Sequence, residues 1–114
     1  MHSISYDVGP ALERFGGDRD FLAECLGLLK AEIPALLAAL KDGIRNNAAE
    51  PTHAAAHALK GMTSNFCEEG PTVTAAEIVE AAREGRMAEA PDLVARLERE
   101  IHALVGSLEA ATAH

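Results

Sequence analysis

Apolar residues recur at intervals of three and four along most of the chain, which is the spacing that lines one side of an α-helix. Alanine is abundant, and no stretch shows the sustained alternation of a β-strand. The pattern predicts a short first helix, ended by Gly16-Gly17, and four longer helices joined by short connections. We therefore expect an all-α fold: an antiparallel up-down-up-down four-helix bundle with a short additional N-terminal helix, in one domain over residues 1–114.

The second predicted helix is the longest, with Asp18 or Asp20 as its N-cap and a break at Asn46-Asn47. Pro34 lies inside this helix and is expected to kink it or to remove one hydrogen bond. The apolar positions form one wide stripe, which we expect to pack into the core. They are Phe21, Leu22, Cys25, Leu28, Leu29, Ile33, Leu36, Leu37, Leu40 and Ile44.

The third helix is predicted from about Pro51 to Phe66 or Cys67, and Gly70-Pro71 interrupts the pattern after it. A fourth helix follows, which Thr72 or Thr74 would cap, and it ends at residue 85. The last helix starts at residues 90–92 and carries the stripe Leu93, Leu97, Ile101, Leu104 and Leu108.

The chain is acidic, with a formal net charge of −8 at pH 7. Phosphate backbones and anionic lipid headgroups repel such a surface, so neither nucleic acid nor a membrane is an expected partner. No apolar run is long enough to span a bilayer, and the first residues lack a signal-peptide pattern, which predicts a cytoplasmic protein. Cys25 and Cys67 lack the spacing of a redox or zinc motif and are expected to be buried, reduced thiols in helices.

One face of the third predicted helix carries unusual chemistry. At 100° per residue, His57 lies about 140–200° from the core stripe and is expected to face solvent. Lys60 and Gly61 follow one turn later on the same face, and Ser64 follows after two turns. Glycine inside a helix costs about 1 kcal/mol relative to alanine, so we expect Gly61 to clear space beside the imidazole. The core stripe of this helix is Ala55, Leu59, Met62 and Phe66.

A phosphoryl group on an imidazole nitrogen suits this face. Imidazole is a good nucleophile near neutral pH, and the Lys60 ammonium would offset the negative charge of the phosphoryl oxygens. Ser64 could donate a hydrogen bond to the group. We therefore expect His57 to carry the phosphoryl group, with Lys60, Gly61 and Ser64 completing the site.

The stretch from His57 to Gly61, read His-Ala-Leu-Lys-Gly and followed by Ser64-Asn65, resembles the phosphorylation motif of histidine-containing phosphotransfer (HPt) domains. The turn at residues 16–18 and the segment at residues 80–85 are also similar to the family, although only residues 57–65 are specific. Members are four-helix bundles that relay phosphoryl groups between receiver-domain aspartates in bacterial two-component phosphorelays. The resemblance implies that His57 is the acceptor, that Lys60 steadies the phosphate and that Gly61 admits the partner.

The resemblance also implies the partners: a response-regulator receiver domain, with a hybrid histidine kinase as a second candidate. The receiver would bring the aspartyl phosphate and a Mg²⁺ ion, so this chain is expected to need no cofactor of its own. Because the sequence has no glycine-rich phosphate loop, we expect no ATP-dependent kinase activity. A monomer is favoured over a dimer. Residues 67–71 depart from the family pattern, which predicts a rebuilt loop after the active helix.

Other interpretations remain open at this stage. His53 either modulates the charge near His57 or has no role, and base rates favour no role. The two histidines have the spacing of a metal-binding pair, but zinc needs further ligands and Lys60 would repel a cation, so no metal site is expected. A helical module that binds a receiver or kinase without accepting phosphate is the main alternative function. The remaining histidines, His2, His102 and His114, are expected to be solvated or helix-capping residues.

Overall fold

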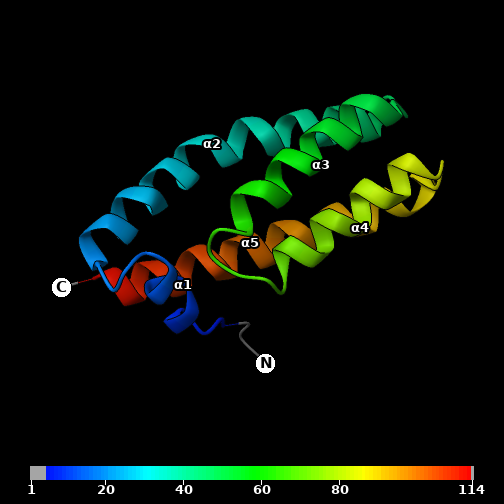
Figure 1. The fold of residues 1–114 in the computed structure, drawn as a ribbon. Coiled ribbons are helices and arrows are strands. Elements are labelled where there is room, and N and C mark those ends of the chain that lie inside the picture. Colours follow the sequence, from blue (N-terminus) through cyan, green and yellow to red (C-terminus); the bar gives the residue numbers. More distant parts are fainter. Residues whose placement is uncertain (1–4, 114) are drawn as a thin grey trace.

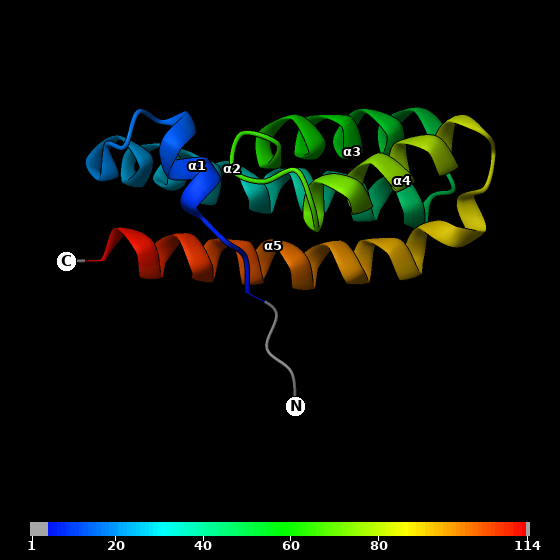
Figure 2. The same ribbon diagram turned by 60° about the horizontal axis from the view of Figure 1, so that its bottom comes forward.

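The computed structural model describes residues 5–113, and all of the regular structure in this range is helical. Four longer helices lie side by side, and the short first helix lies across the C-terminal turns of α5 (Figures 1 and 2). Each longer helix contacts the next along the chain, and α2 also contacts α5. The prediction of an all-α fold with a short first helix is therefore confirmed. The elements are α1 (Gly9–Arg14), α2 (Arg19–Arg45), α3 (Ala49–Thr63), α4 (Pro71–Arg83), the 3₁₀ turn η1 (Met87–Glu89) and α5 (Ala90–Thr112).

Local signals in the sequence set several of the helix ends. The Asp18 carboxylate accepts a hydrogen bond of 3.0 Å from the Phe21 N–H, as expected of an N-cap. Gly16 and Gly17 have φ values of 72° and 76°, a conformation that ends α1 at low cost only because both residues lack a Cβ. Helix α2 continues through Pro34, whose ring is on the exposed side of the helix.

The expected capping of α4 by a threonine is wrong. Helix α4 begins at Pro71 with Gly70 as the N-cap, so both threonines lie inside the helix. The Thr72 hydroxyl donates to the Cys67 carbonyl at 2.9 Å, and the Thr74 hydroxyl donates to the Glu100 carboxylate on α5. These side chains tie α4 to the preceding loop and to α5 instead of satisfying its first N–H groups.

The boundaries and burial of the third helix also differ from the prediction. Helix α3 begins two residues earlier than expected and ends at Thr63, with Ser64 as its C-cap. Cys67 consequently lies outside any helix, whereas Cys25 lies in α2 as predicted. Both thiols are free, but both are only half-buried, so their expected burial is wrong. The segment between Ser64 and Gly70 is an irregular loop.

The core is one cluster of apolar side chains from all of the α-helices. The α5 stripe is confirmed, although Leu93 is only half-buried. On α2, Phe21 and Leu28 are 48% and 66% exposed, so their expected burial is wrong, and Leu26 takes a core position instead. Leu26 has the spacing of a core residue, four after Leu22, and the periodicity could have found it. No helix in the described part of the chain is long and apolar enough to cross a membrane.

Candidate functional site

His57 lies on the outer face of α3, away from the buried residues of that helix. Its side chain is exposed, whereas Ala55, Ala56 and Leu59 are at most 5% exposed. The bundle therefore buries one side of α3 and presents His57 on the other, as the periodicity predicts.

The neighbours of His57 lie on two different sides of it. With 100° per residue, Gly61 is turned about 40° from His57 toward Met62, which packs against α2. His53 and Lys60 are turned about 40° and 60° in the opposite direction, toward α4. The face of α3 thus has an open side bordering α2 and a cationic side bordering α4.

Gly61 leaves the open side empty. Apart from its chain neighbours and the backbone of its own helix, a Cβ built at this position would meet no atom within 4 Å, and the residue is exposed. Nothing in the described fold therefore requires glycine here, although glycine weakens a helix interior. The space is available to a group that approaches from outside.

Lys60 supplies an unpaired positive charge. The residue is half-buried, and among residues 5–113 its ammonium has no hydrogen bond or ion pair. Lys60 differs in this from residues such as Lys41, whose ammonium forms an ion pair with the Glu98 carboxylate at 2.8 Å. Lys60 is consequently available to an anionic group on His57, one turn away.

Ser64 occupies a different position from the other predicted site residues. It is the C-cap of α3, and its hydroxyl donates to the Gly61 carbonyl at 2.9 Å. Its own carbonyl accepts a hydrogen bond from the Arg14 guanidinium of α1, which also forms an ion pair with Glu68 at 3.4 Å. Ser64 would have to give up its bond to Gly61 before it could donate to a phosphoryl group.

His53 lies beside His57 with its ring in nearly the same orientation. The ring centroids are 6.1 Å apart and the ring planes differ by 8°. His53 is half-buried in a hollow between α3 and α4, which is lined by Ala49, Glu50, His53, Ala82 and Arg83. No group of three or more histidine, cysteine or acidic side chains within residues 5–113 has the arrangement of a metal site.

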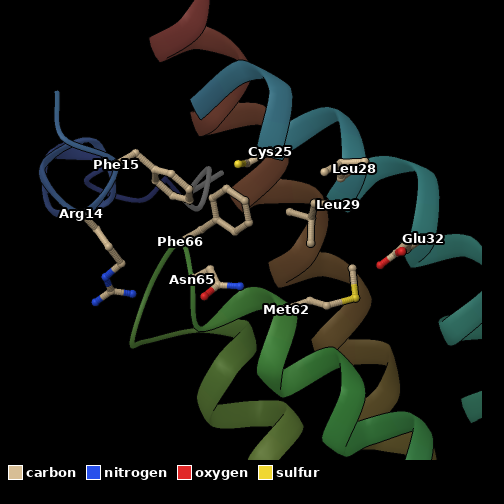
Figure 3. A pocket seen from close by; sticks show the side chains of 9 residues that line it. All are labelled: Arg14, Phe15, Cys25, Leu28, Leu29, Glu32, Met62, Asn65 and Phe66. Carbon is tan, nitrogen blue, oxygen red and sulfur yellow. The ribbon is translucent and has the colours of Figure 1, made fainter. Parts of the chain in front are cut away.

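An apolar groove, here called the α2–α3 groove, lies on the α2 side of α3 (Figure 3). Leu28 and Leu29 enter it from α2 and Met62 from α3, while the rings of Phe15 and Phe66 stack at 5.6 Å at one end. Arg14 and Glu32 lie at opposite ends of the labelled set (Figure 3). The complete lining is Arg14, Phe15, Cys25, Leu28, Leu29, Glu32, Met62, Asn65 and Phe66.

The loop after α3 and the first described residues line a common hollow, in which Tyr6 and Cys67 lie. Burial raises the pKa of the Cys67 thiol, partly opposed by its hydrogen bonds, so the thiol favours its unreactive protonated form. Burial and the nearby Glu100, Cys67 and Glu69 raise the pKa of Tyr6 to about 12. Both shifts favour the neutral forms of these side chains.

Sequence reasoning missed several residues that shape the site. The hydrogen bond from Arg14 to Ser64 at the end of α3 joins residues fifty positions apart, and no local sequence pattern predicts it. Arg83 comes close to His53 only because α4 packs on α3. Leu28 was misassigned to the core because a wide apolar stripe does not show which of its edges a neighbouring helix covers.

Comparison with known families agrees with this helical fold. The family model of the Hpt domain matches residues 24–108, which include all of α3 and α4 and most of α2 and α5. The chain therefore belongs to the Hpt domain family, whose members take part in histidine phosphotransfer in phosphorelays. No curated protein and no solved structure matches the chain.

Proposed function

We propose that this protein relays a phosphoryl group between receiver-domain aspartates through a phosphorylated His57. The observation that carries the proposal is the exposed His57 imidazole between an unpaired Lys60 ammonium and the empty space over Gly61. A structural histidine would need neither neighbour. One domain with an up-down-up-down order of the longer helices is part of the same proposal, since short connections favour antiparallel neighbours.

The transfer needs a nucleophile, charge compensation and room for the donor. A ring nitrogen of His57 that carries no proton donates its lone pair to phosphorus, and an N–P bond forms. The bond between phosphorus and the aspartyl oxygen breaks, and its electron pair leaves with the aspartate carboxylate. The imidazole keeps the proton on its second nitrogen, so the phosphorylated ring is cationic and the phosphoryl group carries two negative charges.

The residues of this chain act by position and charge. The Lys60 ammonium stabilises the phosphoryl oxygens during transfer and afterwards. The empty space over Gly61 lets the acyl phosphate approach in line with the ring nitrogen. The receiver supplies its own Mg²⁺, and this chain needs to hold no metal for the reaction.

The receiver is expected to dock across the outer faces of α2 and α3. The α2–α3 groove and the exposed Leu28 side chain offer apolar contact on the same side of His57 as Gly61. A partner seated there reaches the imidazole over the glycine and leaves Lys60 on the far side of the phosphoryl group. Continuity between the groove and the acceptor face supports this placement.

The test is transfer from phosphorylated receiver domains in the presence of Mg²⁺, with wild-type protein and His57→Gln. We expect label on the wild type that is stable to base and labile to acid, and none on the variant. His102→Gln is the matched control, because His102 is an exposed helical histidine on α5 and lines a hollow with residues of α2 and α5, none of them from α3. Binding of receivers without any transfer would overturn the proposal in favour of an interaction module that accepts no phosphate. Label from ATP and Mg²⁺ alone would contradict the expected absence of kinase activity.

A further inference from the structure

The His53 ring, which can carry a positive charge, lies nearly parallel to the ring of His57, the proposed acceptor. The two centroids are 6.1 Å apart, too far for a direct hydrogen bond between the rings but close enough for an electrostatic effect of a few fold. His53 lies on the α4 side of His57, opposite Gly61. A partner that approaches over Gly61 therefore leaves His53 in place.

None of the described groups around His53 forms an ion pair with it, so a charge on His57 can influence the charge of His53. On α3 itself, Glu50 shares the hollow with His53, and Lys60 lies on the same side of the helix. From α4, Arg83 lines the hollow, and its guanidinium is paired with Glu80 at 3.3 Å. No α2 residue of the described chain lines the hollow. His53 has no ion pair within residues 5–113, and a new negative charge on His57 would add to that of the Glu50 carboxylate, which lines the same hollow.

We propose that His53 is a positioning residue that couples the phosphorylation of His57 to pH. The inference rests on the proposed function and deepens it. The charged form of His53 stabilises the phosphoryl group on the neighbouring ring, and the neutral form does not. Because the histidine side chain generally changes its charge between about pH 5 and pH 8, the contribution of His53 to the phosphorylated state of His57 grows as the pH falls through this window.

The size of the coupling follows from the separation of the rings. At 6.1 Å and the dielectric constant of water, each unit of negative charge on the His57 ring favours charging of His53 by about threefold. Thermodynamic linkage is reciprocal, so charge on His53 favours phosphorylation by the same factor. The factor is about threefold while the phosphorylated ring keeps its proton, and about tenfold after that proton leaves.

A competition experiment measures this coupling directly. Wild-type protein and His53→Gln are mixed in equal amounts with a small amount of one phosphorylatable receiver and Mg²⁺, so that the phosphoryl group equilibrates between them. Intact mass spectrometry then gives the ratio of the two phosphorylated forms from pH 6 to pH 8.5. Any pH dependence of the receiver cancels in this ratio. We expect the wild type to be favoured by about three- to tenfold at pH 6 and by less than twofold at pH 8.5.

Two further variants make the result decisive. His53→Lys keeps a positive charge throughout the range, so it should compete at least as well as the wild type at pH 8.5. His102→Gln, which changes a histidine on α5, should give a ratio of one at every pH. A flat ratio near one for His53→Gln, with both forms phosphorylated, overturns the role of His53 and leaves the proposed function intact. Absence of phosphate on both forms overturns the proposed function and, with it, this inference.

Discussion

Gly43 of α2 lies so close to Thr52 of α3 that a Cβ at position 43 would fall 2.6 Å from the Thr52 hydroxyl oxygen and 3.0 Å from its backbone nitrogen. The backbone of a packed helix cannot move aside cheaply, so Gly43→Ala should destabilise the fold by about 1–3 kcal/mol. Urea unfolding of the variant and the wild type measures the difference. Equal midpoints would show that the two helices separate more easily than their packing indicates.

Alanine at position 61, unlike alanine at position 43, should stabilise the fold. A methyl group at Gly61 meets nothing within 4 Å, and alanine favours the helix, so Gly61→Ala should raise the free energy of unfolding by about 0.5–1 kcal/mol. The same methyl group would obstruct the approach of the receiver, so transfer to His57 should slow by about tenfold or more. Unfolding and transfer rates are measured on the same preparation.

Gly106→Ala is the matched control for Gly61→Ala. Gly106 is also exposed within a helix, and a Cβ there meets nothing within 4 Å. This variant should gain similar stability and transfer phosphate at the wild-type rate. If transfer also slows in Gly106→Ala, the slower transfer of Gly61→Ala would come from added stability and not from obstruction. Transfer at the wild-type rate in Gly61→Ala would contradict the proposed role of Gly61.

Lys60→Gln should separate function from stability. Because the ammonium of Lys60 has no partner among residues 5–113, its loss should change the free energy of unfolding by less than about 0.5 kcal/mol. The phosphoryl group would lose a charge-assisted contact, so the equilibrium yield of phosphorylated His57 should fall by about tenfold. Lys60→Arg keeps the charge and should recover part of the yield. An unchanged yield in Lys60→Gln would exclude Lys60 from the site.

Leu28→Ala tests the α2–α3 groove as the receiver surface. The Leu28 side chain is 66% exposed, so its truncation should leave stability within about 0.5 kcal/mol of the wild type. If the receiver covers it, binding should weaken by about fivefold or more. Val73→Ala removes an exposed apolar side chain from α4 and should have no effect on binding. Similar receiver affinities for both variants would move the docking surface away from the groove.

The raised pKa of Tyr6 predicts an alkaline loss of stability. Its ordinary value is 10.0 and burial with nearby acidic groups raises it to about 12, so the folded state keeps a proton that the unfolded state releases. The contribution is complete below pH 10 and disappears as the pH rises from 10 to 12. It should amount to about 1 kcal/mol, because the half-buried ring is partly screened by solvent. Tyr6→Phe should flatten the stability profile in this window, and an equally steep decline in Tyr6→Phe would assign the loss to other groups.

The predictable part of the fold is the part set by residues close together in sequence. Periodicity located every longer helix, and of the two predicted caps of α2, Asp18 and Asp20, the structure has Asp18. The threonines of α4 show the limit of such reasoning. Thr72 and Thr74 have the residue type of a cap, but their hydroxyls bond to the Cys67 carbonyl and to Glu100, and Glu100 becomes a neighbour only when α5 folds back.

For the site, the sequence by itself determined that His57, Lys60 and Gly61 share the outer face of one helix, because the helical repeat is local and the core stripe of α3 is unambiguous. Only the tertiary structure decided which residues of the other helices lie beside that face. Packing of α2 left Leu28 outside, and packing of α4 brought Arg83 to the hollow that holds His53. A repeat along the chain fixes which way a side chain points from its own helix, whereas its neighbours depend on how the helices meet across the core.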